Sequence, residues 1–296
     1  MRKTFTQNEI NAFAPAEKIG LVACVNPEGD VHVTLITSIM AAGPKQLTLG
    51  QFSTGLSKYY MQLNPNVGFL VMSMDKQLWR GKARWTHKRS DGPEYEIYNN
   101  QPMFRYNAYF GINTVHYLDL IEICSEGKLP MGKIIPAALI TRFAKGSAAT
   151  GNHVPILKPF AQNLFNQLDA LKFLAYIGKD GFPRVIPVIQ CQASDSRRLV
   201  FSSLASRDEL QTIATNTAAG IFGLNLKMQS VFVRGVFRGF DRYRGITLGA
   251  VDIDWVYNSM PPSHGQIYPE STLEPVTDFY GATSRISPLS KAAAMR

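Results

Sequence analysis

The sequence contains few cysteines and no long apolar run. Its three cysteines, Cys24, Cys124 and Cys191, occur singly in strand-like runs, and none has the spacing of a metal site. No apolar run reaches the ~18 residues that a membrane-spanning helix requires. The basic N-terminus is not followed by the apolar core of a secretory signal. These absences favour a cytoplasmic protein with reduced core thiols, and they argue against a metal site or a membrane partner.

Familiar catalytic and nucleic-acid-binding patterns are also missing. The five histidines show no metal-ligand spacing. Neither a Ser/His/Asp set nor a pair of carboxylates can be recognised, so the sequence names no catalytic residue. The net charge is +9, but the lysines and arginines are scattered rather than gathered in blocks. This distribution favours small anionic ligands over nucleic acid.

What the sequence does contain is a long internal repeat. The stretch "LVACVNPEGDVHVTLI", from Leu21, resembles "FLAYIGKDGFPRVIPVI", from Phe173, and the turn glycines Gly29 and Gly181 are 152 residues apart. The same spacing relates three further pairs: Leu47 and Leu199, Asn64 and Asn216, and Gly68 and Gly220. Later, "RGKARW" at Arg80 matches "RGVFRGF" at Arg234 with a spacing of 154, which predicts a hairpin two residues longer in the second copy.

Each copy is predicted to consist of short strands around one helix. The apolar run 21–25 and the alternating residues 31–35 flank a glycine-containing hairpin turn. Further strands are expected at 47–50, 67–72, 79–85 and 115–123. An amphipathic helix is indicated by residues at i, i+3, i+4 and i+7, namely Leu56, Tyr59, Tyr60 and Leu63. Asn64-Pro65 should end that helix.

This pattern predicts two domains and a tail. Many short antiparallel strands with one embedded helix are typical of a small barrel. We place the first barrel at 1–145, the second at 146–260 and a C-terminal extension at 261–296, with the connection between the copies at about 125–159.

The order of these motifs resembles the FMN-binding split-barrel families: pyridoxamine 5'-phosphate oxidase-like proteins, flavin reductases and small FMN-binding proteins. The resemblance rests on "LTLG", a Ser/Thr/Lys helix ending in "NPNV", then "FLVMS", "RGKARW" and "SDGPEYE". It covers residues 20–125 well and 170–257 more loosely. It implies an antiparallel barrel that works as a two-fold dimer with FMN between the barrels. We therefore expect a mainly β fold with embedded helices: two tandem six-stranded split β-barrels that form a pseudo-dimer within one chain.

The resemblance also suggests a cofactor site at "QFSTGLSKYY", residues 51–60. A helix start offers free N–H donors and a partial positive charge to a phosphate, and this one adds hydroxyl groups and a lysine. Family members often place the cation where this chain has Ser57, so the choice between Ser57 and Lys58 stays open. Thr37 and Ser38 match positions beside the phosphate and ribityl chain. The implied FMN-binding residues are Thr37, Ser38, Ser53, Thr54, Ser57, Lys58 and Gln77, with Gln77 near the flavin ring.

The second copy has lost this cluster. A spacing of 152 relates Ser53, Thr54, Ser57 and Lys58 to Ala205, Ser206, Glu209 and Leu210. A carboxylate at Glu209 would repel a phosphate, and Arg207 would offset it only in part. We therefore expect one FMN per chain, at the first copy, with the second barrel forming a wall of the ring pocket.

Simpler interpretations accompany each of these predictions. Ser53, Thr54 and Ser57 could simply cap the helix, and Arg80, Lys82 and Arg84 could form one solvated strand face. The leading function is an FMN-dependent oxidoreductase that uses a small redox substrate or NAD(P)H. The alternatives are a non-catalytic electron carrier or sensor, the same fold with a deazaflavin or haem, and a structural protein with a vestigial pocket. A homodimer of the intact chain is left open.

Overall fold

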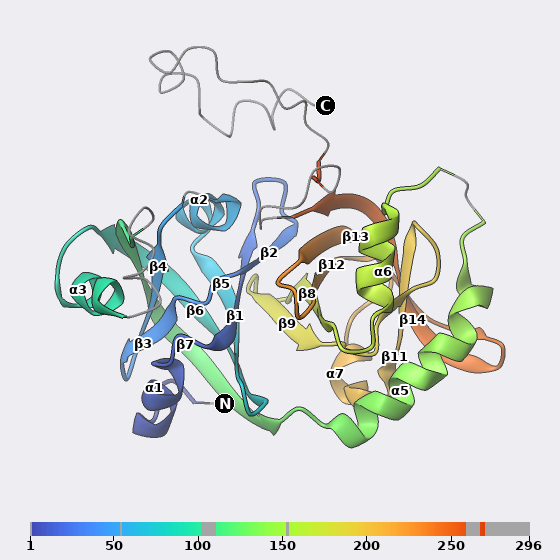
Figure 1. Ribbon diagram of the computed structural model, residues 1–296, viewed down its shortest axis with the longest axis horizontal. Helices are drawn as coiled ribbons and strands as arrows, with labels where there is room; N and C mark the ends of the chain where they lie inside the picture. Colours follow the sequence, from blue (N-terminus) through green and yellow to red (C-terminus); the bar gives the residue numbers. More distant parts are fainter. Residues whose placement is uncertain (1, 54, 102–110, 152–153, 259–266, 270–296) are drawn as a thin grey trace, which may run out of the picture.

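The computed structural model describes all residues except 1, 54, 102–110, 152–153, 259–266 and 270–296. The expected extension at 261–296 therefore lies almost entirely outside the described residues. In Figure 1 the chain forms two units side by side, the first in blue to green and the second in green to red.

The first unit contains seven strands and three helices in its described residues. Its elements are α1 (Gln7–Phe13), β1 (Lys18–Val25), β2 (Val31–Leu35), β3 (Ile39–Gly43), β4 (Gln46–Gln51), α2 (Leu56–Leu63), β5 (Asn66–Ser73), β6 (Gln77–Arg89), α3 (Pro93–Asn100) and β7 (Thr114–Lys128).

The second unit contains seven further strands. Its elements, with the helices that lead into it, are α5 (Met131–Ala144), the 3-10 helix η1 (Lys145–Ala148), α6 (Pro159–Asn166), β8 (Leu171–Ile177), β9 (Pro183–Pro187), β10 (Gln192–Ala193), β11 (Arg198–Ser202), η2 (Ser203–Ala205), α7 (Arg207–Leu210), β12 (Thr217–Leu224), β13 (Ser230–Tyr243) and β14 (Ile246–Tyr257).

The two sheets have the same topology. The first is ordered β2-β1-β5-β6-β7-β4-β3 and the second β9-β8-β12-β13-β14-β11-β10, and all of their strand pairs are antiparallel. In each sheet the two edge strands are consecutive in the chain, joined by residues 36–38 or 188–191. A sheet whose edges are joined so closely must curl back on itself, so each unit is a barrel left open along one side. The prediction of a mainly β tandem pair is confirmed, with seven strands per sheet where six were expected.

The repeat keeps a spacing of 152 residues as far as β6 and β13, and only the last strands, β7 and β14, are related by a different spacing, because Asp119 and Asp252 are equivalent. Gly29 and Gly181 both adopt positive φ, of 87° and 76°, in equivalent hairpin turns. Lys82 pairs with Gly68 and Arg234 pairs with Gly220, so Lys82 and Arg234 are equivalent and still 152 residues apart. The prediction of a hairpin two residues longer in the second copy was therefore wrong. Arg80 corresponds to Phe232, because these residues pair with Leu70 and Phe222.

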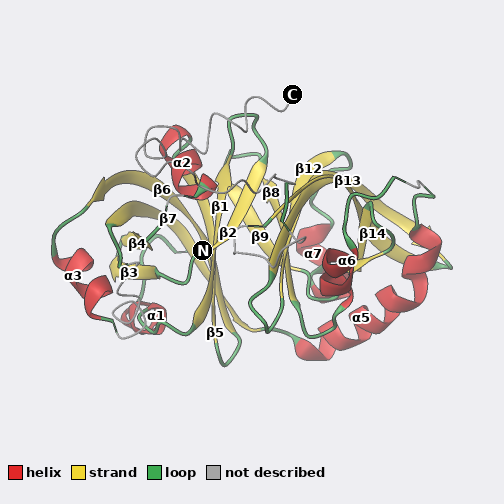
Figure 2. Ribbon diagram, turned by 45° about the horizontal axis from the view of Figure 1, so that its top comes forward, coloured by secondary structure: helices red, strands yellow, loops and turns green. Residues whose placement is uncertain are grey.

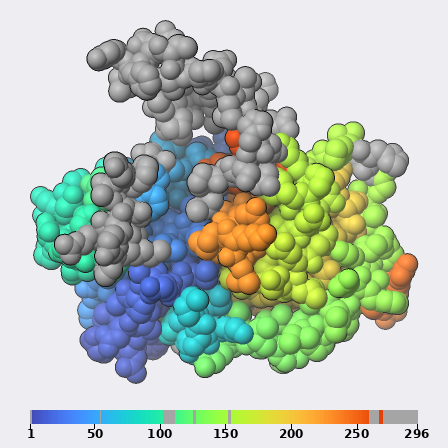
Figure 3. Space-filling model, in the orientation of Figure 1, coloured from blue at the N-terminus to red at the C-terminus, as the bar shows by residue number. Residues whose placement is uncertain are grey.

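An apolar core joins the two barrels. In β1, Val22 and Cys24 point into the first barrel, whereas Leu21 and Ala23 point into a core shared with the second unit. The second unit contributes Phe173, Ala175, Val185, Ile189, Phe222, Leu224 and Phe232 to this shared core. Burial on both faces explains why β1 is almost continuously apolar. Figures 2 and 3 show the two units in direct contact.

The units approach most closely at Gly68. A Cβ atom placed there would lie 2.2 Å from the carbonyl oxygen of Pro183 in the second unit. Asn66, two residues earlier, donates a hydrogen bond from Nδ2 to the carbonyl oxygen of Gly181, at 3.2 Å. Glycine at position 68 is thus required because another backbone passes beside it.

The connection between the copies contains regular secondary structure. The segment 125–159 includes the end of β7 and the 14-residue helix α5. Helix α5 contacts β10, β11 and β14 of the second sheet, although it precedes the predicted boundary at 145/146. The domain boundaries themselves remain predictions.

A truncated chain ending at Gly146 is expected to aggregate or self-dimerise. It would expose the shared-core residues of β1, β2 and β5, including Leu21, Val33 and Leu70, which are at most 1% exposed in the full chain. Size-exclusion chromatography with light scattering measures the outcome. A stable monomeric fragment would contradict the assignment of this surface as an interface.

Candidate functional site

The predicted phosphate site lies at the start of α2. The helix follows Gly55, which adopts an extended conformation (φ −134°, ψ 166°), and no side chain caps its first turn. Ser53 and Ser57, the two described hydroxyl residues of the capping interpretation, therefore do not cap the helix. Thr54 lies outside the described residues. The first-turn N–H groups have no side-chain acceptor from the described part of the chain, as an anion site requires.

Two buried polar side chains occupy this first turn. Ser57 is fully buried, and its Oγ has no hydrogen-bond partner among the described residues. Lys58 is 8% exposed; its Nζ lies 3.5 Å from the carbonyl oxygen of Ser53 and 6.0 Å from the ring centroid of Phe52. Burial lowers the pKa of Lys58 below its usual value. A buried ammonium with one long polar contact and a buried hydroxyl with none are costly without a ligand, so these residues fit a phosphate.

A neutral histidine lies near Lys58. Burial, with the charges of Lys58 and Lys88, lowers the pKa of His116 to about 4. The Trp85 indole Nε1 donates to His116 Nδ1 at 3.2 Å. Because indole nitrogen only donates, the imidazole proton resides on Nε2 and is directed to Oε1 of Gln51, at 2.8 Å. Sequence reasoning missed this set, because His116 and Gln51 come together only through the pairing of β4 with β7.

Ser38 and Thr37 are adjacent in sequence but have different surroundings. Ser38 is buried and its Oγ donates to the carbonyl oxygen of Gly50, at 2.6 Å, so it holds the end of β4 that leads to α2. Thr37 instead lines a mainly apolar cavity of about 290 Å³ together with Leu171 and Leu224 of the second unit.

Gln77 lies at the far end of β5 from α2. Helix α2 leads into β5 through Pro65, and Gln77 follows the hairpin at the other end of that strand. An eight-residue strand spans about 26 Å. The structure thus groups Ser53, Ser57 and Lys58 at the helix start, with Ser38 fixing the adjoining strand end, and separates Gln77 from them. The ligand-binding roles of all seven residues remain predictions.

In the second unit the position equivalent to Ser57 takes part in an ion pair. Glu209 accepts two hydrogen bonds from Arg80, at 2.9 and 2.8 Å, and Arg80 also donates to the carbonyl oxygen of Val185, at 2.7 Å. The sequence analysis expected Arg207 to offset the charge of Glu209. The cation that pairs with Glu209 is instead Arg80 of the first barrel. This ion pair occupies the place where a second phosphate would bind.

The charged face of β6 is not solvated as a whole. Arg80 is 14% exposed, and Lys82 lies 2.8 Å from both Glu122 and Asp180. The Arg84 guanidinium lies 5.7 Å from the ring centroid of Phe182 in the second unit. The solvated-face interpretation was therefore wrong for Arg80 and Lys82, which pair with Glu209 and Asp180 across the interface, whereas Arg84 is exposed as expected.

The interface beside α2 is aromatic instead. His32, 1% exposed, contacts Tyr60 of α2 at a centroid distance of 5.4 Å and Phe232 and Tyr257 of the second unit at 5.5 and 5.3 Å. Burial, with the charge of Arg234, lowers the pKa of His32 to about 3. The second barrel thus presents Phe232 and Tyr257 to His32 next to α2, whereas the Arg80–Glu209 pair lies at the equivalent helix α7.

No cluster of three or more potential metal ligands occurs in the described part of the chain. Nor does any helix there have the length and apolar character needed to cross a membrane. No two of the three cysteines are bonded to each other, and Cys24 and Cys191 are buried.

Comparisons with known proteins give structural matches only. No family model matches the sequence, and no curated protein does. An FMN-binding protein from Syntrophomonas wolfei subsp. wolfei matches with 12% identity, covering 41% of this chain and 86% of its own, at a TM-score of 0.35. A FAD-binding protein from Mesorhizobium loti matches with 16% identity over 40% and 93%, at 0.29. The styrene monooxygenase flavin reductase from Pseudomonas putida S12 matches with 7% identity over 38% and 83%, at 0.27.

Proposed function

We propose that this chain binds one FMN, with its phosphate at the first turn of α2, and acts as an FMN-dependent oxidoreductase. The observation that supports the site is that, among the described residues, the buried Lys58 has one long polar contact and the buried Oγ of Ser57 has none, at a helix start that no described side chain caps. A phosphate would satisfy both groups and the free N–H donors of the helix.

Each group at the site has a defined task under this proposal. Lys58 supplies the charge opposite the phosphate, and Ser57 Oγ and the first-turn N–H groups donate hydrogen bonds to it. Ser38 holds the end of β4 through Gly50. The ring contacts of His32 with Tyr60, Phe232 and Tyr257 fix α2 against the second barrel. FMN, when bound, would supply the hydride- and electron-transfer chemistry.

A flavin-binding electron carrier or sensor is the second candidate. It is favoured by the aromatic side chains beside α2 and by His32 and His116, whose lowered pKa values keep both imidazoles neutral, so that neither is a ready proton donor. Reduction of the bound flavin by NAD(P)H separates the two functions, because an oxidoreductase with that donor accelerates it and a carrier does not. Both ring nitrogens of His116 have partners, which weighs against this histidine as a haem ligand.

The purified protein is expected to carry FMN rather than FAD or riboflavin. The visible spectrum should show flavin absorbance bands, and heat release followed by mass spectrometry should identify the ligand. Haem in the preparation, or a colourless protein that takes up no FMN when it is supplied, would contradict the proposed function.

FMN affinity is expected to fall with rising pH earlier than an ordinary lysine would allow. Only charged Lys58 attracts the phosphate, and burial lowers its pKa. Affinity should therefore decline once the pH exceeds the pKa of Lys58 in the free protein. Fluorescence titrations between pH 7 and pH 10 measure the decline, and Lys58→Ala should show none. An equal slope in both proteins would assign the effect to another group.

A further inference from the structure

A cleft of about 460 Å³ lies in the second unit, within the size range of small-molecule sites. Its wall comes from the segment after η1, the start of β11, and strands β13 and β14. The lining residues are Ala149, Thr150, Arg197, Arg198, Val236, Arg238, Asp252, Ile253 and Asp254. The lining carries three arginines and two aspartates, an excess of one positive charge.

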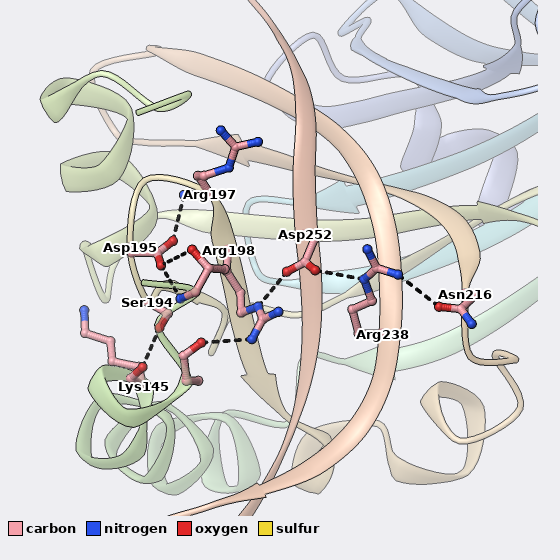
Figure 4. Close-up of polar contacts among 10 residues, drawn as sticks. Lys145, Ser194, Asp195, Arg197, Arg198, Asn216, Arg238 and Asp252 are labelled. Carbon is pink, nitrogen blue, oxygen red and sulfur yellow. Dashed lines mark hydrogen bonds and ion pairs between the residues drawn. The ribbon is translucent and has the colours of Figure 1, made fainter. Parts of the chain in front are cut away.

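Two of these arginines share one carboxylate. Arg198 Nε donates to Asp252 Oδ1 at 2.6 Å, and Arg238 Nε donates to Asp252 Oδ2 at 2.8 Å, so Asp252 lies between two guanidinium groups (Figure 4). Each guanidinium is fixed by a second contact through Nη1: Arg198 to the carbonyl oxygen of Ala148, at 3.1 Å, and Arg238 to Oδ1 of Asn216, at 3.2 Å. Among the described residues, the Nη2 group of each has no partner.

Backbone irregularities place this pair. Strand β13 has two residues, Arg238 and Gly239, opposite the single residue Ala250 of β14, which is a β-bulge, and Gly239 adopts φ +87°. Such bulges redirect side chains and occur often beside functional sites. A second bulge lies in β14, where Asp254 is the extra residue because Arg234 pairs with Trp255 and Gly235 with Ile253.

The first barrel has the same bulge without the arginines. The positions 152 residues before Arg197, Arg198 and Arg238 are Lys45, Gln46 and Thr86. Ladder pairing confirms the equivalence of Gln46 and Arg198, because Gln46 pairs with Asp119 and Arg198 with Asp252. A carboxylate thus occupies this position in both barrels, as Asp119 and as Asp252. The two arginines beside it are present in the second barrel only.

We propose that this cleft binds a small oxyanion, a carboxylate or a phosphate, through the Nη2 groups of Arg198 and Arg238. Two oriented guanidinium groups held by one carboxylate retain a net charge of +1, and arginine matches the oxygens of carboxylate and phosphate. Asp254 lies on the same wall, so a cationic group on the ligand would be placed there. The site is separate from α2 and does not depend on FMN.

The test is equilibrium dialysis of the full chain with radiolabelled inorganic phosphate at constant ionic strength. One saturable site should remain in Lys58→Ala, which removes the cation at α2. In Arg238→Gln that site should weaken by about 10- to 150-fold. Arg242→Gln is the matched control, because Arg242 is exposed on the same strand outside the cleft, and it should bind as the wild type does.

Displacement of phosphate by succinate would identify a carboxylate site, and failure of succinate to compete would identify a phosphate site. Equal affinity in Arg238→Gln and Arg242→Gln, or no saturable binding in Lys58→Ala, would overturn the proposal. Circular dichroism checks that each variant is folded. If Arg238→Gln does not fold, Arg197→Gln, which leaves the Asp252 contacts intact, should still weaken phosphate binding about threefold or more through the loss of one lining charge.

Discussion

Lys58→Ala is expected to weaken FMN binding by about 10- to 150-fold, because a charge-assisted hydrogen bond contributes roughly 1.5–3 kcal/mol. Lys58 is only 8% exposed, so little water would screen its interaction with a phosphate. Lys58→Ala should not lower the free energy of unfolding of the unliganded protein. The Lys58 ammonium has one polar contact among the described residues, at 3.5 Å. Removing this desolvated charge relieves a cost of folding.

Arg207→Ala is the matched control for this substitution, since it removes one positive charge at the equivalent helix of the second unit. It should leave FMN affinity nearly unchanged, as should Leu210→Ala, the residue equivalent to Lys58, apart from any loss of stability. Isothermal titration of the apo-proteins gives the affinities. A larger effect from Arg207→Ala than from Lys58→Ala would place the phosphate in the second unit.

Arg80→Ala is expected to lower the free energy of unfolding by about 3 kcal/mol, at the lower end of the range for breaking buried ion pairs. The substitution removes both hydrogen bonds to Glu209 and the one to Val185, and it leaves the carboxylate of Glu209 at an interface with its partner gone. The side chains of Arg80 and Glu209 are 14% and 32% exposed, so water compensates only in part.

Arg89→Ala on the same strand is the comparison. Arg89 pairs with Asp91, but these side chains are 52% and 76% exposed, and exposed pairs contribute about 0–1 kcal/mol. Urea denaturation measures both variants. Replacing Arg80 and Glu209 together by methionine should recover much of the loss, because no charge is then left unpaired. Equal stabilities for Arg80→Ala and Arg89→Ala would show that the ion pair does not hold the barrels together.

The strands and the duplication were predictable because they depend on local signals. Gly29 and Gly181 mark equivalent turns, and the apolar run of β1 indicates a strand buried on both faces. The Asn64-Pro65 stop correctly ended α2. Each of these features is written in a few neighbouring residues.

The contacts between distant strands were not predictable in the same way. The equivalence of Arg80 with Phe232 follows from ladder register, and local similarity between "RGKARW" and "RGVFRGF" pointed to a different alignment. Arg80 is 129 residues from Glu209 in the chain, so its burial at the interface has no local signal. The contact of His116 with Gln51 and the contacts of Asp252 with its two arginines also join residues that are distant in the chain. The sequence therefore did not predict them.

The most direct test of the proposed site compares FMN with riboflavin, which lacks the phosphate, in the wild type and in Lys58→Ala. Fluorescence titration of each apo-protein gives affinity and stoichiometry. We expect one FMN per chain, a loss of about 10- to 150-fold on changing either the ligand or Lys58, and no further loss on changing both. Two FMN per chain, or an equal effect of Lys58→Ala on riboflavin and FMN, would contradict a phosphate site at α2.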